Sequence, residues 1–91
     1  MTPSTPSLSI VLPCLNEAEN LTTLLPAIKE AQPNAEILVI NDGSTDESLA
    51  ICQQNGVKVI SHPHPLGNGA SIKTGAREAS GDIIVFMDAD G

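Results

Sequence analysis

Four short runs of apolar residues recur along the chain, and a segment with helical periodicity separates each run from the next. The runs are Leu8–Leu12, Glu36–Ile40, Val57–Ile60 and Asp82–Met87. Their apolar residues are nearly continuous rather than alternating, which is typical of strands buried on both faces of a parallel sheet. The β-α-β-α-β-α-β order therefore predicts an α/β fold: a Rossmann-like parallel sheet of four strands with right-handed crossovers and helices on both faces.

The three segments between the apolar runs are predicted to be helices. The first spans Glu17–Ala31, and we expect Pro26 to kink it and divide it into two pieces. The second follows the S-x-x-E pattern of Ser44–Glu47, which is typical of a capping box, and runs to about Gln54. The third segment, Ala70–Ala79, is predicted to be a helix with an apolar face made of Ile72, Ala76 and Ala79.

The composition limits the classes of protein to be considered. A chain of 91 residues forms one domain, which we place at residues 8–91 after a Pro/Ser/Thr-rich, disordered leader at residues 1–7. A net charge of −7 argues against nucleic acid and anionic membranes as partners. The two cysteines, Cys14 and Cys52, lack any metal or disulfide pattern, and we expect buried, unreactive thiols in a cytoplasmic protein.

Polar and acidic residues follow three of the predicted strands. Ligands of open α/β sheets bind outside the carboxyl ends of the strands, so these residues are candidates for one shared site. They are Pro13, Asn16 and Glu17 after the first strand, Asn41 to Ser44 after the second, and Asp88 and Asp90 after the fourth.

Asp88 and Asp90 form a D-x-D pattern directly after an apolar strand. Side chains two positions apart on an extended segment lie on the same side, roughly 6–7 Å apart. Two carboxylates so placed repel each other unless a cation is near, and Mg²⁺ or Mn²⁺ prefers such oxygen ligands together with phosphates. The pattern therefore predicts a metal–diphosphate site, with a solvated acidic turn as the alternative.

Two other candidates have equally plain structural alternatives. Asp42 could accept an N–H group of a nucleobase, or it could form an Asx turn in the NDGS loop, a role that suits Asn41 better. Asn68 could cap the third helix, while Gly67 and Gly69 would let the main chain approach a phosphate or ribose. His62 lacks the companions that a metal ligand would need.

Four segments in this order resemble family-two glycosyltransferases with the GT-A fold, and in particular the dolichol-phosphate or polyprenyl-phosphate mannose and glucose synthases. They are SIVLPCLNEAENL, EILVINDGSTDES, GNGASIKTGAREASGD and IIVFMDADG, and the resemblance as a whole covers about residues 8–91. The resemblance implies the N-terminal, nucleotide-sugar-binding half of such an enzyme. It implies a UDP- or GDP-linked sugar as donor and, as acceptor, a polyprenyl phosphate at the cytoplasmic face of a membrane.

The resemblance also implies roles for individual residues. The nucleotide would be bound by Pro13, Asn16, Glu17, Asp42, Gly69 and Asp88. Glu17 would face the base or ribose and Asp42 would hold the base. Asp88 and Asp90 would hold Mg²⁺ or Mn²⁺, which stabilises charge on the departing nucleoside diphosphate.

The family's acceptor half and catalytic base would lie beyond Gly91, so no catalytic base is assigned. We expect the 91-residue chain to be a truncated domain that transfers no sugar. We also expect the uncovered fourth strand to pair with another copy. The alternatives are a non-catalytic assembly module that binds no donor, a receiver- or phosphatase-type Mg²⁺ domain, and a nucleotidyltransferase. This chain lacks the acidic first strand end that a receiver- or phosphatase-type domain needs and the basic glycine-rich first loop of a nucleotidyltransferase.

Overall fold

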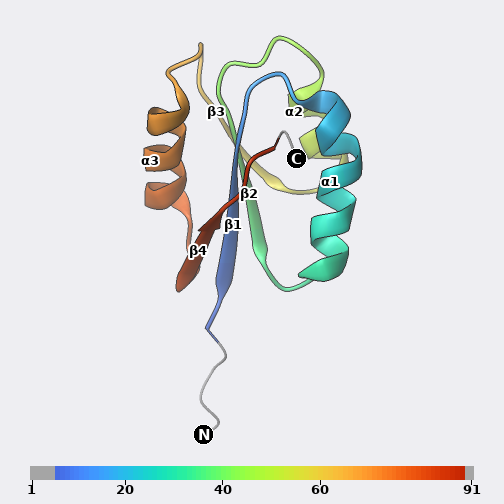
Figure 1. Cartoon of the computed structure of the whole chain (residues 1–91), viewed down its shortest axis with the longest axis vertical. Coiled ribbons are helices and arrows are strands. Elements are labelled where there is room, and N and C mark those ends of the chain that lie inside the picture. Colours follow the sequence, from blue (N-terminus) through green and yellow to red (C-terminus); the bar gives the residue numbers. More distant parts are fainter. Residues whose placement is uncertain (1–5, 90–91) are drawn as a thin grey trace, which may run out of the picture.

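Strands and helices alternate along the chain in the order that the sequence predicts (Figure 1). The computed structural model describes residues 6–89. Its elements are β1 Leu8–Cys14, α1 Ala18–Ala31, β2 Glu36–Asn41, α2 Ser48–Gln54, β3 Lys58–Ser61, α3 Asn68–Glu78 and β4 Ile83–Phe86. Residues 1–5 of the predicted leader lie outside the described part. Ser7 lies against the start of β4, where its N–H donates to Asp82 Oδ2 at 3.1 Å.

Within residues 6–89 the four strands form one parallel sheet in the order β3-β2-β1-β4, which confirms the predicted class. Helices α1 and α2 cover one face and α3 covers the other (Figure 1). The larger core cluster lies on the α1 and α2 face, and a smaller cluster made of Val11, Leu38 and Ile40 lies on the α3 face. The larger cluster consists of Ile10, Leu12, Cys14, Leu21, Leu25, Ile28, Ile37, Val39, Cys52 and Ala89.

The central strands β1 and β2 are buried on both faces, as their apolar runs predict, but β4 is not. Ile83, Val85 and Phe86 expose 51%, 41% and 42% of their surface. The reason is position: β4 is an edge strand, and α3 packs mainly on β1 and β2. The expectation of a buried fourth strand is therefore wrong, while its place at the edge of the sheet is confirmed.

Proline breaks neither β1 nor α1. Strand β1 continues through Pro13 to Cys14 instead of ending at Leu12. Along β1 the main-chain groups of successive residues face β4 and β2 in turn. Val11 O accepts the N–H of Met87 on the β4 side, and Cys14 O accepts the N–H of Asp42 on the β2 side. Pro13 thus turns its nitrogen toward β4, past the last paired residue of that strand, so no ladder bond is lost.

Helix α1 runs unbroken through Pro26, so the predicted division does not occur. The buried residues Leu21, Leu25 and Ile28 hold the helix on the sheet across the proline. Pro26 itself is exposed, and water can therefore bond the carbonyl that it leaves unpaired. Among the described residues, no helix has both the length and the apolar character needed to cross a membrane.

The other two helices also differ in detail from the expectation. Helix α2 begins at Ser48 without a capping box, because Ser44 Oγ accepts the N–H of Asn16 instead of a group of its own helix. Helix α3 buries Ser71, Thr74 and Gly75 rather than the predicted apolar face. A Cβ at position 75 would collide with Cγ1 of Val11, so small residues let this helix approach the sheet closely.

Candidate functional site

A cleft of about 210 Å³ opens at the carboxyl ends of β1 and β2, beside the first turn of α3. We call it the carboxyl-end cleft. Its lining residues are Pro13, Cys14, Leu15, Asp42, Pro65, Gly67, Asn68 and Ser71. The structure therefore brings two of the predicted nucleotide-binding residues, Pro13 and Asp42, into one cleft, at the edge of the sheet where open α/β folds bind ligands.

Asp42 is buried beside this cleft, and its carboxylate is held by the loop that follows β3. Oδ1 accepts the N–H of Leu66 at 2.9 Å and lies 2.8 Å from Nδ1 of His62. Oδ2 accepts the N–H of Gly67 at 3.0 Å. Burial raises the pKa of Asp42, but these hydrogen bonds outweigh burial, and the net shift of the pKa is downward. Within the NDGS loop the local side-chain bond is made by Asn41 and not by Asp42: Oδ1 of Asn41 accepts the N–H of Ser44, three positions on, at 3.1 Å.

His62 links three elements at this edge of the sheet. An ionised carboxylate can only accept, so Nδ1 of His62 donates to Asp42, and Nε2 lies 3.0 Å from Oγ1 of Thr74 on α3. The side chains of His62 and Asp42 are only 10% and 7% exposed. Sequence analysis considered His62 as a metal ligand alone and missed this role. The available signal was its position directly after a strand, beside the candidate residues.

Asn16 and Glu17 serve the framework of the site and do not line the cleft. Asn16, with a left-handed φ of 56°, accepts the N–H groups of Thr45 and Asp46 at its Oδ1, at 2.8 and 3.2 Å. The N–H of Glu17 donates to Ser48 Oγ at 3.0 Å. These bonds join the loop after β1 to the loop after β2, and so they fix the walls on which the cleft is built.

Asp46 completes that joint. Its Oδ2 accepts the N–H of Ala18, the first residue of α1, at 3.1 Å, and its Oδ1 accepts the N–H and hydroxyl of Ser48 at 2.9 and 2.6 Å. Burial raises the pKa of Asp46, yet the hydrogen bonds prevail and lower it. A carboxylate near the first turn of a helix is also favoured by the helix dipole.

The remaining predicted residues are less completely placed. Gly69 is an exposed residue in the first turn of α3, with open space where a Cβ would be. Asp88 is exposed after β4, outside the set that lines the cleft. Asp90 lies outside the described residues. Within residues 6–89, no group of three or more His, Cys, Asp or Glu side chains is arranged to hold a metal ion.

Two small side chains line the cleft although the sequence did not predict them as site residues. Cys14 is a buried free thiol, and burial raises its pKa, as an unreactive cysteine requires. Ser71 is 1% exposed, and among the described residues its Oγ is the one buried side-chain polar atom without a hydrogen-bond partner.

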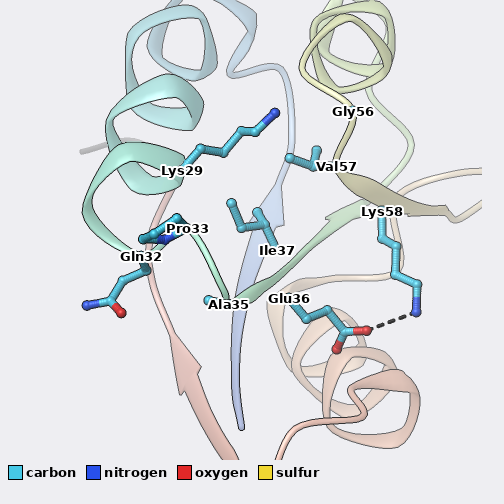
Figure 2. A pocket seen from close by; sticks show the side chains of 9 residues that line it. All are labelled: Lys29, Gln32, Pro33, Ala35, Glu36, Ile37, Gly56, Val57 and Lys58. Atoms are coloured by element: carbon cyan, nitrogen blue, oxygen red, sulfur yellow. Dashed lines mark hydrogen bonds and ion pairs between the residues drawn. The ribbon is translucent and has the colours of Figure 1, made fainter.

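A larger cleft, of about 440 Å³, lies at the opposite edge of the sheet, between the end of α1 and the starts of β2 and β3 (Figure 2). Its charged groups are already engaged with the protein. Lys29 donates to the main-chain oxygen of Asn55, and Lys58 forms an ion pair with Glu36 at 2.9 Å. These bonds make this cleft a structural junction rather than a candidate binding site.

Glu36 is the centre of that junction. Besides Lys58, its carboxylate accepts the N–H of Ser80 at 3.0 Å and the hydroxyls of Ser9 and Ser80 at 2.7 and 3.0 Å. The bond from Lys58, followed by those from Ser80 and Ser9, lowers the pKa of Glu36 to about 2. The start of β2 is thereby tied to β1, to β3 and to the segment before β4.

Comparison with known families agrees with this arrangement. The sequence model of glycosyl transferase family 2 matches residues 9–91. The chain belongs to glycosyltransferase family 2. This confirms the family-two resemblance, and the parallel sheet of this family 2 chain matches those of GT-A glycosyltransferases.

Two related sequences illustrate the likeness of this family 2 chain to longer proteins. A glycosyltransferase of uncharacterized function from Mycobacterium bovis is 35% identical over 85 residues, which are 93% of this chain and 37% of that protein. A dolichol-phosphate mannosyltransferase from Pyrococcus furiosus is 39% identical over 88 residues, covering 90% of this chain and 25% of that protein. The chain thus spans well under half the length of these relatives.

A solved structure gives the same result. The glucosyl-3-phosphoglycerate synthase from Mycobacterium tuberculosis, in complex with Mn²⁺, UDP and glucosyl-3-phosphoglycerate, superposes with a TM-score of 0.81 at 29% identity. The match covers 92% of this family 2 chain and 33% of the synthase.

Proposed function

We propose that this chain is the part of a family 2 glycosyltransferase that binds the nucleotide sugar, with a UDP- or GDP-linked sugar as donor. One observation carries the proposal: the carboxyl-end cleft joins Pro13, Asp42 and the first turn of α3 at the ligand-binding edge of a parallel sheet. Support comes from the solved synthase of similar fold, which binds UDP and Mn²⁺.

We further propose that Asp88 and Asp90 would hold Mg²⁺ or Mn²⁺ together with the donor's diphosphate. Carboxylate oxygens suit either ion, and the exposed Asp88 lies beyond the carboxyl end of β4, at the same edge as the cleft. When bound, the metal would stabilise negative charge on the nucleoside diphosphate. Asn16 and Glu17, whose contacts described above lie within the fold, would act by holding the adjoining loops in place.

A polyprenyl phosphate is our proposed acceptor, on the basis of the likeness to a dolichol-phosphate mannosyltransferase. The 91 residues match about a quarter to two fifths of the related proteins, and no catalytic base is assigned among them. We therefore propose that this chain alone binds nucleotide weakly and transfers no sugar.

The test is a titration of the ¹⁵N-labelled chain with UDP, GDP and their sugar conjugates, followed by two-dimensional NMR. In the presence of Mg²⁺ we expect UDP and GDP to shift the amide signals of Asp42, of Asn68 and of the residues next to Pro13 in the sequence. The expected Kd values of these nucleotides are in the millimolar range. Inorganic phosphate and glucose serve as controls. Donor binding by this chain is refuted if no nucleotide changes the spectrum at a concentration about 10–20-fold above a Kd of roughly 1 mM.

A second candidate function is assembly without donor binding. The exposed side chains of Ile83, Val85 and Phe86 on the edge strand β4 favour it, because such an edge can pair with a strand of another copy. Oligomers in the absence of any nucleotide response would support this candidate over the first.

A further inference from the structure

The hydroxyl of Ser71 is a polar group of the carboxyl-end cleft that has no hydrogen-bond partner within the described residues. Ser71 lines the cleft from the first turns of α3 and is 1% exposed. Its N–H is used within the helix, where it donates to Gly67 O at 3.1 Å. Its Oγ has no hydrogen-bond partner among the described residues, although buried polar groups are nearly always paired. A hydroxyl kept in this state is available to a ligand.

Asp42, which also lines this cleft, has little acceptor capacity left. An ionised carboxylate offers about four acceptor positions. His62 and Leu66 occupy Oδ1, and Gly67 occupies one position of Oδ2. Asp42 can therefore take one more N–H at Oδ2, while Ser71 can donate its O–H.

The remaining walls suit a flat ring. Pro13, Leu15 and Pro65 line the cleft with apolar surface. Its volume of about 210 Å³ is below the roughly 300–1,000 Å³ typical of sites that enclose a whole small ligand. The cleft thus fits one part of a nucleotide, and its apolar walls with two polar contacts match a base better than a diphosphate.

We propose that Ser71 donates a hydrogen bond to a carbonyl oxygen of the nucleobase whose neighbouring ring N–H would bind Asp42, the role that the family resemblance already implies for that residue. The ligand class is a base with a C=O next to a ring N–H, which uracil and guanine have and which adenine and cytosine lack. Ser71 would then be a residue that determines which nucleoside diphosphates bind. This inference rests on the proposed donor-binding function.

Ser71→Ala tests the proposal, because it removes the hydroxyl and leaves the helix intact. We expect UDP and GDP to bind Ser71→Ala about three- to tenfold more weakly than wild type, the effect of one lost hydrogen bond, with Mg²⁺ present throughout. ADP and CDP should bind both chains equally poorly. The melting temperature should stay the same or rise, because the variant no longer buries an unpaired hydroxyl.

Ser80→Ala is the matched control. Its hydroxyl donates to Glu36 at the opposite edge of the sheet, so its loss should lower the melting temperature and leave nucleotide affinity unchanged. Equal binding of UDP by wild type and Ser71→Ala, or a lower melting temperature of Ser71→Ala, would overturn the role of Ser71 and leave the proposed function standing. Absence of binding of all four nucleotides by wild type would overturn both.

Discussion

Nδ1 of His62 lies 2.8 Å from Oδ1 of Asp42, and this contact joins the loop after β3 to the carboxyl end of β2. Leu66 and Gly67 of the same loop donate to the same carboxylate. The loop thus forms one wall of the carboxyl-end cleft, and Asp42 is the residue that holds it there.

Replacement of His62 by Ala should loosen that wall. The change leaves Oδ1 of a buried carboxylate with one donor fewer, so we expect the free energy of unfolding to fall by about 1–3 kcal/mol, measured by urea denaturation. His64→Ala, at an exposed position of the same loop, is the control and should change stability little. Equal stability of the two variants would show that the His62–Asp42 contact contributes nothing.

Glu36 should make the free energy of unfolding depend on pH in the acidic range. Its folded-state pKa of about 2 lies below the ordinary value of 4.5, so its bonds stabilise the fold fully above pH 4.5. That stabilisation is lost as the pH falls from about 4.5 to about 2, because the unfolded chain then binds the proton more readily. We expect the free energies of unfolding of wild type and Glu36→Gln, measured by urea denaturation across this pH range, to converge as the pH falls.

Glu30→Gln makes the same change of charge at an exposed position of α1 and controls for the overall electrostatic effect. A gap between wild type and Glu36→Gln that stays constant from pH 6 to pH 2 would contradict the assignment.

Gly75→Ala should destabilise the domain. The added methyl group would meet Cγ1 of Val11 and push α3 away from the sheet, which in a tightly packed core costs about 1–3 kcal/mol. Gly69→Ala, in the same helix with open space around it, should instead stabilise the chain by about 0.5–1 kcal/mol. Calorimetry of both variants checks the pair, and a destabilising Gly69→Ala would indicate that helix propensity is not the deciding factor there.

The Gly69→Ala variant also tests the predicted nucleotide contact. If the main chain at Gly69 lies against the donor, the added methyl group should weaken UDP binding even though the chain is more stable. Unchanged affinity would remove Gly69 from the predicted set.

The exposed strand β4 should govern self-association. We expect wild type to form concentration-dependent oligomers, and Val85→Lys to reduce them, because a charged residue on an edge strand opposes pairing with another copy. Leu49→Lys, on the exposed surface of α2, is the control and should leave the distribution unchanged. Light scattering at several concentrations gives the result, and a wild-type monomer throughout would contradict the prediction.

The sheet was predictable because its signals are local. Apolar runs such as Ile37–Ile40 and the turn residues between elements fix the order of strands and helices without knowledge of the contacts. The inward face of α3 was not predictable in this way. Ile72 suggested the wrong face, since the close approach of Gly75 to Val11 lets small polar residues face the sheet instead.

For the candidate site, the convergence of Pro13 and Asp42 was predictable from the sequence, but the bonds around them were not. Pro13 and Asp42 do line one cleft, because strand ends in a parallel sheet must meet. The bonds of Asn16 to Thr45 and Asp46, and of His62 to Asp42, join segments about 20 to 30 positions apart. Such pairings depend on the folded geometry, and residue type alone does not reveal them.

The position of β1 between β2 and β4 bears on synthesis in the cell. The N–H of Ile83 bonds to the main-chain oxygen of Ser7, so one side of β1 is completed by a strand that is synthesised only after β2 and β3. Until that late strand emerges, the nascent chain carries an open strand edge on β1, and such edges are prone to mispair. Chaperone protection during translation would therefore matter more for this domain than for one whose neighbouring strands are consecutive.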